Sequence, residues 1–267
     1  MSATSSSPAD SGPLDDVARR LLAAASAEGV PLRLLGGVGI RLLLGDRLHP
    51  SLRRDVADLD FITTRRAGAA VERLIAAHGW EPRRRFNAVH GAHRLLFDET
   101  AGGERHIDVF VGGFRMCHQL PLLERLEERP ETLPATDLLL TKLQIVTLND
   151  KDRRDLYALL LGCPVGADNE AGTASGEIRP PAIEASRVAA LAAADWGLCH
   201  TIELNLGRLR DGLRAGALDA EARERIGVQL DALDGAIQAA PKSRAWRLRA
   251  RVGERRRWYE DPEEVTR

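Results

Sequence analysis

The stretch Leu32-Arg33-Leu34-Leu35-Gly36-Gly37 decides the fold, together with the later run Asp58-Leu59-Asp60-Phe61-Ile62-Thr63. The apolar residues of the first stretch predict a buried strand that runs into a glycine turn and a helix through Leu44. The second run alternates polar and apolar residues and becomes β-branched toward its end, which predicts another strand. Because side chains two positions apart in a strand point to the same side, Asp58 and Asp60 should lie next to each other.

A third carboxylate lies in His106-Ile107-Asp108-Val109-Phe110, which is also typical of a strand. If the two Asp-bearing strands are neighbours, three aspartates converge. Like charges so close together are tolerated when a cation lies between them, and Mg²⁺ favours carboxylates combined with substrate phosphates. We therefore predict that Asp58, Asp60 and Asp108 are metal ligands and catalytic residues, with room for two Mg²⁺ ions during phosphoryl or nucleotidyl transfer.

Gly36 and Gly37 complete the predicted site. Between a strand and a helix, their backbone N–H groups could approach a triphosphate, and the positive end of the helix favours an anion. Taken singly, the features have simpler interpretations: Gly-Gly is typical of a plain turn, and Asp-x-Asp of an exposed edge. The ordered set of glycine turn, helix, Asp-x-Asp strand and single-Asp strand is what favours a nucleotide site.

With these residues the chain resembles the nucleotidyltransferase superfamily that includes DNA polymerase β, over about Leu32 to Gly113. Its members share a Gly-Gly or Gly-Ser turn, an Asp-x-Asp/Glu pair on the next strand and a third carboxylate on a later strand. A closer likeness, to uncharacterised bacterial nucleotidyltransferase-like proteins, covers nearly the whole chain after Gly29. It is carried by three segments: Arg33 to Arg41, Leu138 to Val146, and the basic tail from Ala240 to Tyr259.

The resemblance implies a Mg²⁺-dependent enzyme that moves NMP from an NTP to an acceptor hydroxyl. RNA (a tRNA end, for example), a small molecule and a protein are all open as acceptors. The alternative is a catalytically inactive nucleotide-binding module, or a toxin–antitoxin interaction module with an antitoxin partner.

Lys142 lies among leucines in a predicted helix. Either its ammonium reaches water along a packed stem, or it neutralises a triphosphate. Asp152 and Asp155 follow, three positions apart on one helical face. Abortive-infection toxin nucleotidyltransferases carry a similar lysine and a basic-Asp-x-x-Asp element, so the likeness implies a nucleotide-binding role for these three residues. A solvated helix face is the alternative. The chain departs from those toxins at Ala57, where they have a small hydroxyl residue, and at Arg65-Arg66, where they have a lysine.

The tail from Lys242 to Trp258 concentrates basic side chains, with Trp246 and Trp258 among them and Glu254 as its one acid. Such a helix is typical of a surface that binds phosphates, and its aromatic rings could stack on bases, which makes RNA a candidate partner. The alternative is a helix docked through Trp246, Leu248 and Val252, with its arginines paired to acidic neighbours. We favour this alternative because the nearly neutral chain supplies the acids.

The whole pattern predicts an α+β fold: a mixed nucleotidyltransferase-type sheet with flanking helices, followed by a C-terminal helical bundle. The predicted parts are a disordered leader over 1–13, a core over 14–115, a helical extension of the core over 116–165, a linker over 166–181 and a C-terminal helical domain over 182–267. Further strands are predicted over 93–97 and 106–111. Helices are predicted over 14–28, 67–78, 136–148, 150–161, 183–213 (with a break near Trp196), 218–239 and 242–259.

Composition excludes several classes of protein. With 38 Lys and Arg against 39 Asp and Glu, the chain is not a globally basic nucleic-acid binder. No apolar run reaches the about 20 residues of a membrane span, and the N-terminus lacks the features of a secretory signal. Three widely spaced cysteines argue against a disulfide framework and for a reducing cytoplasm. We therefore expect a cytoplasmic protein with no membrane partner.

Overall fold

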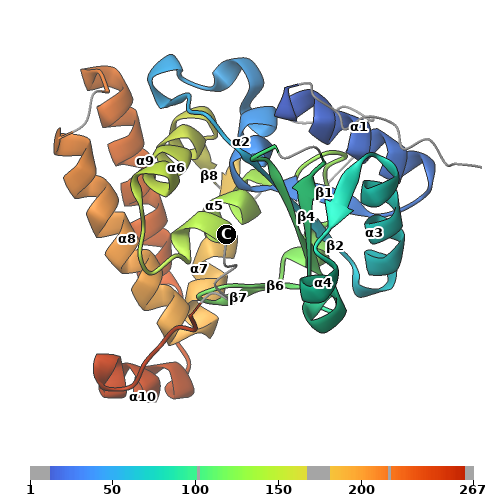
Figure 1. Cartoon of the computed structure of the whole chain (residues 1–267). Coiled ribbons are helices and arrows are strands. Elements are labelled where there is room, and N and C mark those ends of the chain that lie inside the picture. Colours follow the sequence, from blue (N-terminus) through green and yellow to red (C-terminus); the bar gives the residue numbers. More distant parts are fainter. Residues whose placement is uncertain (1–12, 101–102, 167–180, 216–217, 262–267) are drawn as a thin grey trace, which may run out of the picture. The chain divides into compact units, whose positions relative to one another are not determined.

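The computed structural model describes residues 13–100, 103–166, 181–215 and 218–261, which form two units (Figure 1). The first unit comprises the chain up to Leu42, Asp55–Phe114 and Pro121–Leu133, and the second comprises Leu43–Arg54, Arg115–Leu120 and the chain from Pro134 onward. The predicted leader over 1–13 and the predicted linker over 166–181 lie outside the described residues, apart from residues 13, 166 and 181.

A mixed five-stranded sheet forms the centre of the first unit, with the strand order β1-β2-β5-β4-β3. The strands are β1 (Leu32–Leu35), β2 (Asp58–Thr63), β3 (Trp80–Pro82), β4 (Arg94–Glu99) and β5 (His106–Val111). β2 and β5 run parallel, whereas the other neighbouring pairs are antiparallel. The two Asp-bearing strands are therefore neighbours, and the α+β fold class is confirmed.

One face of this sheet is apolar and packs against helices α1 (Leu14–Ala27) and α3 (Gly68–Ala77) (Figure 1). Each helix turns an apolar stripe toward the sheet, and the strands contribute every second residue to the same core. In the two central strands these fully buried residues are Leu59, Phe61, Ile107 and Val109. The intervening residues, which include the three aspartates, point to the opposite face.

One strand and one α-helix of the first unit were not predicted, β3 and α4 (Arg84–His90). A proline argues against a strand, but Pro82 lies in the edge strand, where a missing N–H can face away from the ladder. Helix α4 is fixed by Asn87, whose side chain accepts from the N–H of Leu96 at 2.9 Å and donates to its carbonyl at 3.3 Å. Tertiary contacts of this kind leave no periodic pattern in the sequence.

The second unit is mainly helical. Its helices are α5 (Ala135–Leu143), α6 (Asp150–Gly162), α7 (Ala185–Ala194), α8 (Trp196–Ala215), α9 (Ala220–Ala239) and α10 (Arg244–Val252), while α2 (Gly36–Leu44) leads into it from β1. Its short strands are β7 (Gln119–Leu120), β8 (Val165–Gly166) and β9 (Ile183–Glu184), while β6 (Phe114–Arg115) has its first residue in the first unit and its second in this one. The predicted break near Trp196 is confirmed: it falls at Asp195, whose carboxylate accepts from the N–H of Leu198. None of the described helices is long and apolar enough to cross a membrane.

Two helices end earlier than predicted. Helix α5 ends at Leu143 because Asn205 of α8 donates to the carbonyls of Leu143 and Ile145, at 2.9 and 2.8 Å, in place of helical N–H groups. Helix α10 ends at Val252 because Gly253 turns the chain with a φ of +59°. The predicted helices over 136–148 and 242–259 were therefore too long.

Candidate active site

Three aspartates share the polar face of the five-stranded sheet. Asp60 of β2 and Asp108 of β5 are register partners in the parallel pair. Asp58 precedes Asp60 by two residues and therefore lies on the same side. All three side chains are half-buried. The structure thus places the three carboxylates that the sequence singled out on one face of the sheet.

Gly36 lies directly against Asp60. Leu35, the residue before it, is the register partner of Asp60, and helix α2 begins at Gly36 with no intervening loop. Gly36 has a φ of +68°, and a Cβ atom there would lie 1.8 Å from Asp60 Oδ2. Glycine is therefore required both by backbone conformation and by space. The positive end of α2, formed by the buried Gly36 and Gly37, faces the Asp60 carboxylate.

Replacing Gly36 by alanine should destabilise the first unit by about 3 kcal/mol or more, because the methyl group must displace Asp60 as well as strain the backbone. Gly29 is a matched control: its φ is +67°, but nothing lies within 4 Å of a Cβ atom there. Gly29→Ala should therefore show backbone strain alone, about 1–2 kcal/mol. Urea unfolding followed by circular dichroism measures both; equal losses would contradict the close packing of Gly36 on Asp60.

Asp108 is held by an arginine of the adjacent strand β4. Arg94 Nε donates to both carboxylate oxygens, at 2.9 and 3.1 Å, and its Nη2 also donates to Oδ2. Each side chain is 16% exposed, and the guanidinium lies 5.3 Å from the centre of the Phe110 ring. Sequence reasoning missed Arg94. Its contact with Asp108 depends on the antiparallel register of β4 and β5, which pairs Leu96 with Asp108 and Arg94 with Phe110 and which the sequence alone does not give.

A second charged cluster lies on the same face. His106, the register partner of Asp58, has its Nδ1 2.7 Å from Asp98 Oδ1, and Arg83 Nε donates to Asp98 Oδ2 at 2.8 Å. The hydrogen bond from Arg83 lowers the pKa of Asp98 against the opposing effect of burial, and the bond to His106 lowers it further. His106 is thus engaged with Asp98 on the face of the sheet that also carries the three aspartates.

The fit of these residues to Mg²⁺ depends on Asp108. Within the described ranges, no three His, Cys, Asp or Glu side chains are grouped closely enough to hold a metal ion. Asp108 is bound to Arg94, whereas Asp58 and Asp60 lie two positions apart on the same side of β2 and are carboxylates of the kind that Mg²⁺ accepts. Mg²⁺ often takes one or two carboxylates and completes its shell with substrate phosphates and water. The face therefore suits an ion that arrives together with a phosphorylated ligand.

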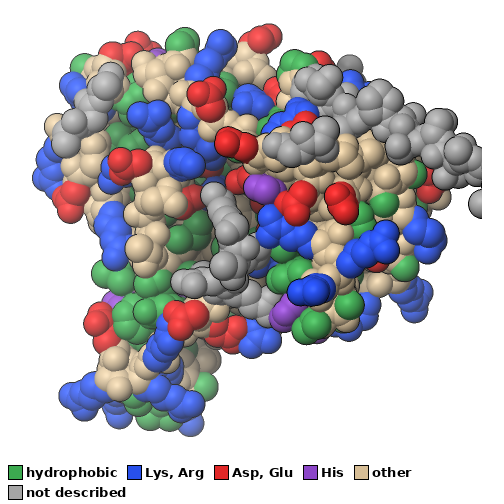
Figure 2. All heavy atoms as spheres, in the orientation of Figure 1, with side chains coloured by type: hydrophobic (Ala, Val, Ile, Leu, Met, Phe, Trp, Pro, Cys, Tyr) green, Lys and Arg blue, Asp and Glu red, His purple; other side chains and the backbone are tan. Residues whose placement is uncertain are grey.

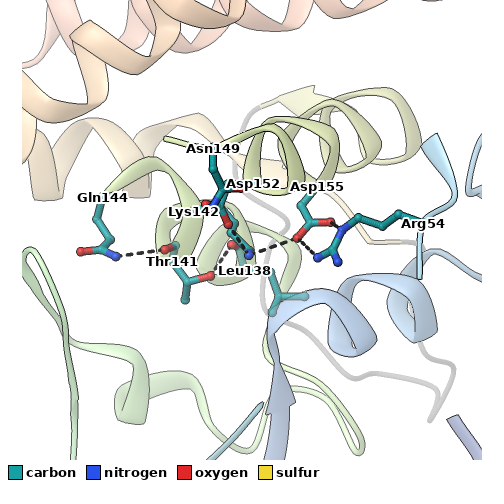
Figure 3. Close-up of polar contacts among 8 residues, drawn as sticks. All are labelled: Arg54, Leu138, Thr141, Lys142, Gln144, Asn149, Asp152 and Asp155. Atoms are coloured by element: carbon teal, nitrogen blue, oxygen red, sulfur yellow. Dashed lines mark hydrogen bonds and ion pairs between the residues drawn. The ribbon is translucent and has the colours of Figure 1, made fainter. Parts of the chain in front are cut away.

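Lys142, Asp152 and Asp155 lie together in the second unit, as Figure 3 shows. Lys142 Nζ is 2.8 Å from Asp152 Oδ1 and 3.1 Å from Asp155 Oδ2. Arg54 completes the cluster, because its Nε and Nη2 donate to the two Asp155 oxygens at 2.8 and 2.7 Å. The four side chains are 8 to 14% exposed. The two basic and the two acidic side chains thus neutralise one another at a site that is largely buried from water.

This cluster changes the interpretation of Asp152 and Asp155, the two aspartates of α6. The alternative of a solvated face is wrong for Asp152 and Asp155, which are 7 and 6% exposed as residues. Asn149 caps the start of α6 by accepting from the N–H of Asp152 at 2.9 Å, which fixes that aspartate beside Lys142. The nucleotide-binding role of the three residues stays a prediction. Their observed contacts are ion pairs to one another and to Arg54, a residue that the sequence did not single out.

No model of a known protein family matches the chain, and no curated protein matches its sequence. The resemblance to nucleotidyltransferases therefore rests on the motif residues themselves. What the fold adds is the sheet order and the register that brings those residues together.

Proposed function

We propose that the protein is a Mg²⁺-dependent nucleotidyltransferase that moves NMP from an NTP to an acceptor hydroxyl. The observation that carries this proposal is the register of β2 and β5, which makes partners of Asp60 and Asp108 with Asp58 on the same side. The start of α2 beside Asp60 supports it, because a helix N-terminus next to carboxylates suits a phosphate–cation pair.

In the proposed reaction the acceptor oxygen attacks the α-phosphorus of the NTP, the bond from that phosphorus to the β-phosphate oxygen breaks, and pyrophosphate leaves. Mg²⁺, bound with the triphosphate, would neutralise the negative charge of the phosphate groups. Asp58 and Asp60 would hold the ion, and the backbone N–H groups of Gly36 and Gly37 would bind phosphate oxygens. In this scheme the residues of the face act mainly by positioning the reactants and by electrostatic stabilisation, which supply most of the rate enhancement in phosphoryl-transfer enzymes.

Asp108 would accept the proton of the acceptor hydroxyl. Its ion pair with Arg94 holds the carboxylate in one orientation, so that Arg94 is a positioning residue in this scheme. The same pair favours a second candidate function. If the ion pair with Arg94 keeps Asp108 from accepting that proton, the face is a nucleotide-binding module without catalysis.

The two candidates are separated by an assay of the purified protein with ATP, CTP, GTP and UTP labelled at the α-phosphate, in the presence of Mg²⁺ and total tRNA or hydroxylated metabolites. Transfer of label to an acceptor, with release of pyrophosphate, supports the enzyme. Mg²⁺-dependent binding of a nucleotide in a calorimeter without transfer supports the inactive module. Neither binding nor transfer would contradict both.

Arg94→Gln should raise the affinity for Mn²⁺, the spectroscopic substitute for Mg²⁺, by about tenfold or about 1.4 kcal/mol. The change removes a cation beside the carboxylates and releases Asp108 as a further ligand. Arg105→Gln is the matched control, because Arg105 pairs with Glu99 elsewhere in the sheet. Titration of free Mn²⁺ by electron paramagnetic resonance measures both variants. An unchanged affinity in Arg94→Gln would show that Arg94 does not compete with the cation.

A further inference from the structure

Helix α10 presents a row of arginines to solvent. Arg244, Arg247 and Arg251 follow one another at spacings of three and four residues, which places them on one side of the helix. Arg255 and Arg256 follow directly, and all five side chains are exposed. Within the part of the chain that the structure describes, none of the five makes a side-chain hydrogen bond or an ion pair. Figure 2 shows basic side chains gathered over this helix.

The opposite side of α10 attaches it to the second unit. Trp246 Nε1 donates to the carbonyl of Ala192 in α7 at 3.0 Å. The Arg249 guanidinium lies 4.5 Å from the centre of the Trp196 ring and donates to the carbonyl of Gly253 at 2.8 Å. Arg249 is therefore a structural arginine. The side of the helix that carries the outward arginines takes no part in this attachment.

These contacts confirm one part of the alternative that the sequence favoured for the tail, docking through Trp246, but the rest of that alternative is wrong. Trp246 is partly buried as that alternative required, but Leu248 and Val252 are 60 and 41% exposed. The arginines of the outward side are not paired with acidic neighbours among the described residues. Since the whole chain carries a net charge of -1, this is a local concentration of positive charge.

We propose that the outward side of α10, with Arg255 and Arg256, binds single-stranded RNA through its phosphates. Guanidinium groups form paired hydrogen bonds with phosphate oxygens, and from Arg244 to Arg251 the helix rises roughly 10 Å, enough to meet successive phosphates. The exposed Leu248 and Val252 lie beside these arginines and can contact base faces, which are accessible where bases are unpaired. The inference stands apart from the proposed chemistry, because it involves no residue of the carboxylate face.

A lipid surface fits this side of the helix less well. Binding of an interfacial helix grows with the apolar area that it buries in the membrane. Here the exposed apolar side chains are Leu248 and Val252, whereas the aromatic Trp246 is already engaged with α7. The balance of charge over apolar area therefore favours a polyphosphate.

The test measures binding of a fluorescein-labelled single-stranded RNA of mixed sequence to the full chain by fluorescence anisotropy. If each of the five arginines neutralises one phosphate, log K falls with log salt at a slope of about −3.5, a loss of about a hundredfold between 50 and 200 mM salt. In the triple variant Arg244→Gln/Arg247→Gln/Arg251→Gln the slope should fall to about −1.4 and the loss to about tenfold.

The control variant removes the same charge from exposed arginines elsewhere in the chain: Arg19, Arg73 and Arg214, each changed to glutamine. It should keep the slope of the unmodified protein. Asp60→Asn should also keep that slope, and this variant distinguishes a failure of RNA binding from a failure of the proposed chemistry. Equal slopes in the α10 variant and the control variant would overturn the inference. So would a lack of RNA binding at 50 mM salt, or binding to phosphatidylserine vesicles without binding to RNA.

Discussion

Asp60→Asn is expected to lower the rate of NMP transfer by at least about 10³-fold, which corresponds to about 4 kcal/mol of transition-state stabilisation. The change keeps the size of the side chain and removes its negative charge. Asp60 is the central carboxylate of the face, because it is the register partner of Asp108, lies two residues from Asp58 and touches Gly36. Initial rates with α-labelled NTP at saturating Mg²⁺ measure the effect, and circular dichroism checks that the variant is folded.

Glu81→Gln is the matched control for this experiment. It makes the same isosteric change at an exposed carboxylate of the edge strand β3, where Glu81 is the register partner of Asp98. The rate of this variant should equal that of the unmodified protein. A full rate in Asp60→Asn would remove the proposed chemistry, whereas a nucleotide that binds to the unmodified protein without being transferred would favour the inactive module.

The central strands were predictable because they obey a local rule. β2 and β5 have the bounds expected from alternating polar and apolar residues, and the same alternation put Asp58 and Asp60 on one side. That the two strands are neighbours was a condition of the predicted site, and the sheet order meets this condition. The register that pairs Asp60 with Asp108 needed the structure, because a shift of one residue would have turned Asp108 to the core.

The arginine partners were not predictable in the same way. Arg94 meets Asp108 across a strand pair, and Arg54 meets Asp155 over a separation of 101 positions. Neither pair leaves a periodic signal, because each depends on how separate elements pack. The same holds for the exposed side of α10. Its amphipathic pattern predicted a docked helix, but the docking contacts come from Trp246 and Arg249, while Leu248 and Val252 remain exposed.

Asp155→Ala should destabilise the second unit by about 3–5 kcal/mol, because it leaves Lys142 and Arg54 as buried cations with too little compensating charge. Both basic side chains are 14% exposed and contact Asp155 within 3.1 Å, so water cannot replace the lost carboxylate. Asp150 of the same helix is the matched control. It also pairs with an arginine, Arg153, but is 85% exposed, so that Asp150→Ala should cost at most about 1 kcal/mol.

Urea unfolding followed by tryptophan fluorescence measures these losses in the unit concerned. Trp196, Trp246 and Trp258 belong to the second unit, and a Trp80→Phe background removes the signal of the first. Adding Arg54→Met to an Asp155→Leu variant should recover much of the stability, because an apolar pair of similar volume carries no desolvation cost. Recovery would assign the loss to the Arg54 charge without its Asp155 partner rather than to poor packing. A loss in Asp155→Ala no larger than in Asp150→Ala would contradict the buried cluster itself.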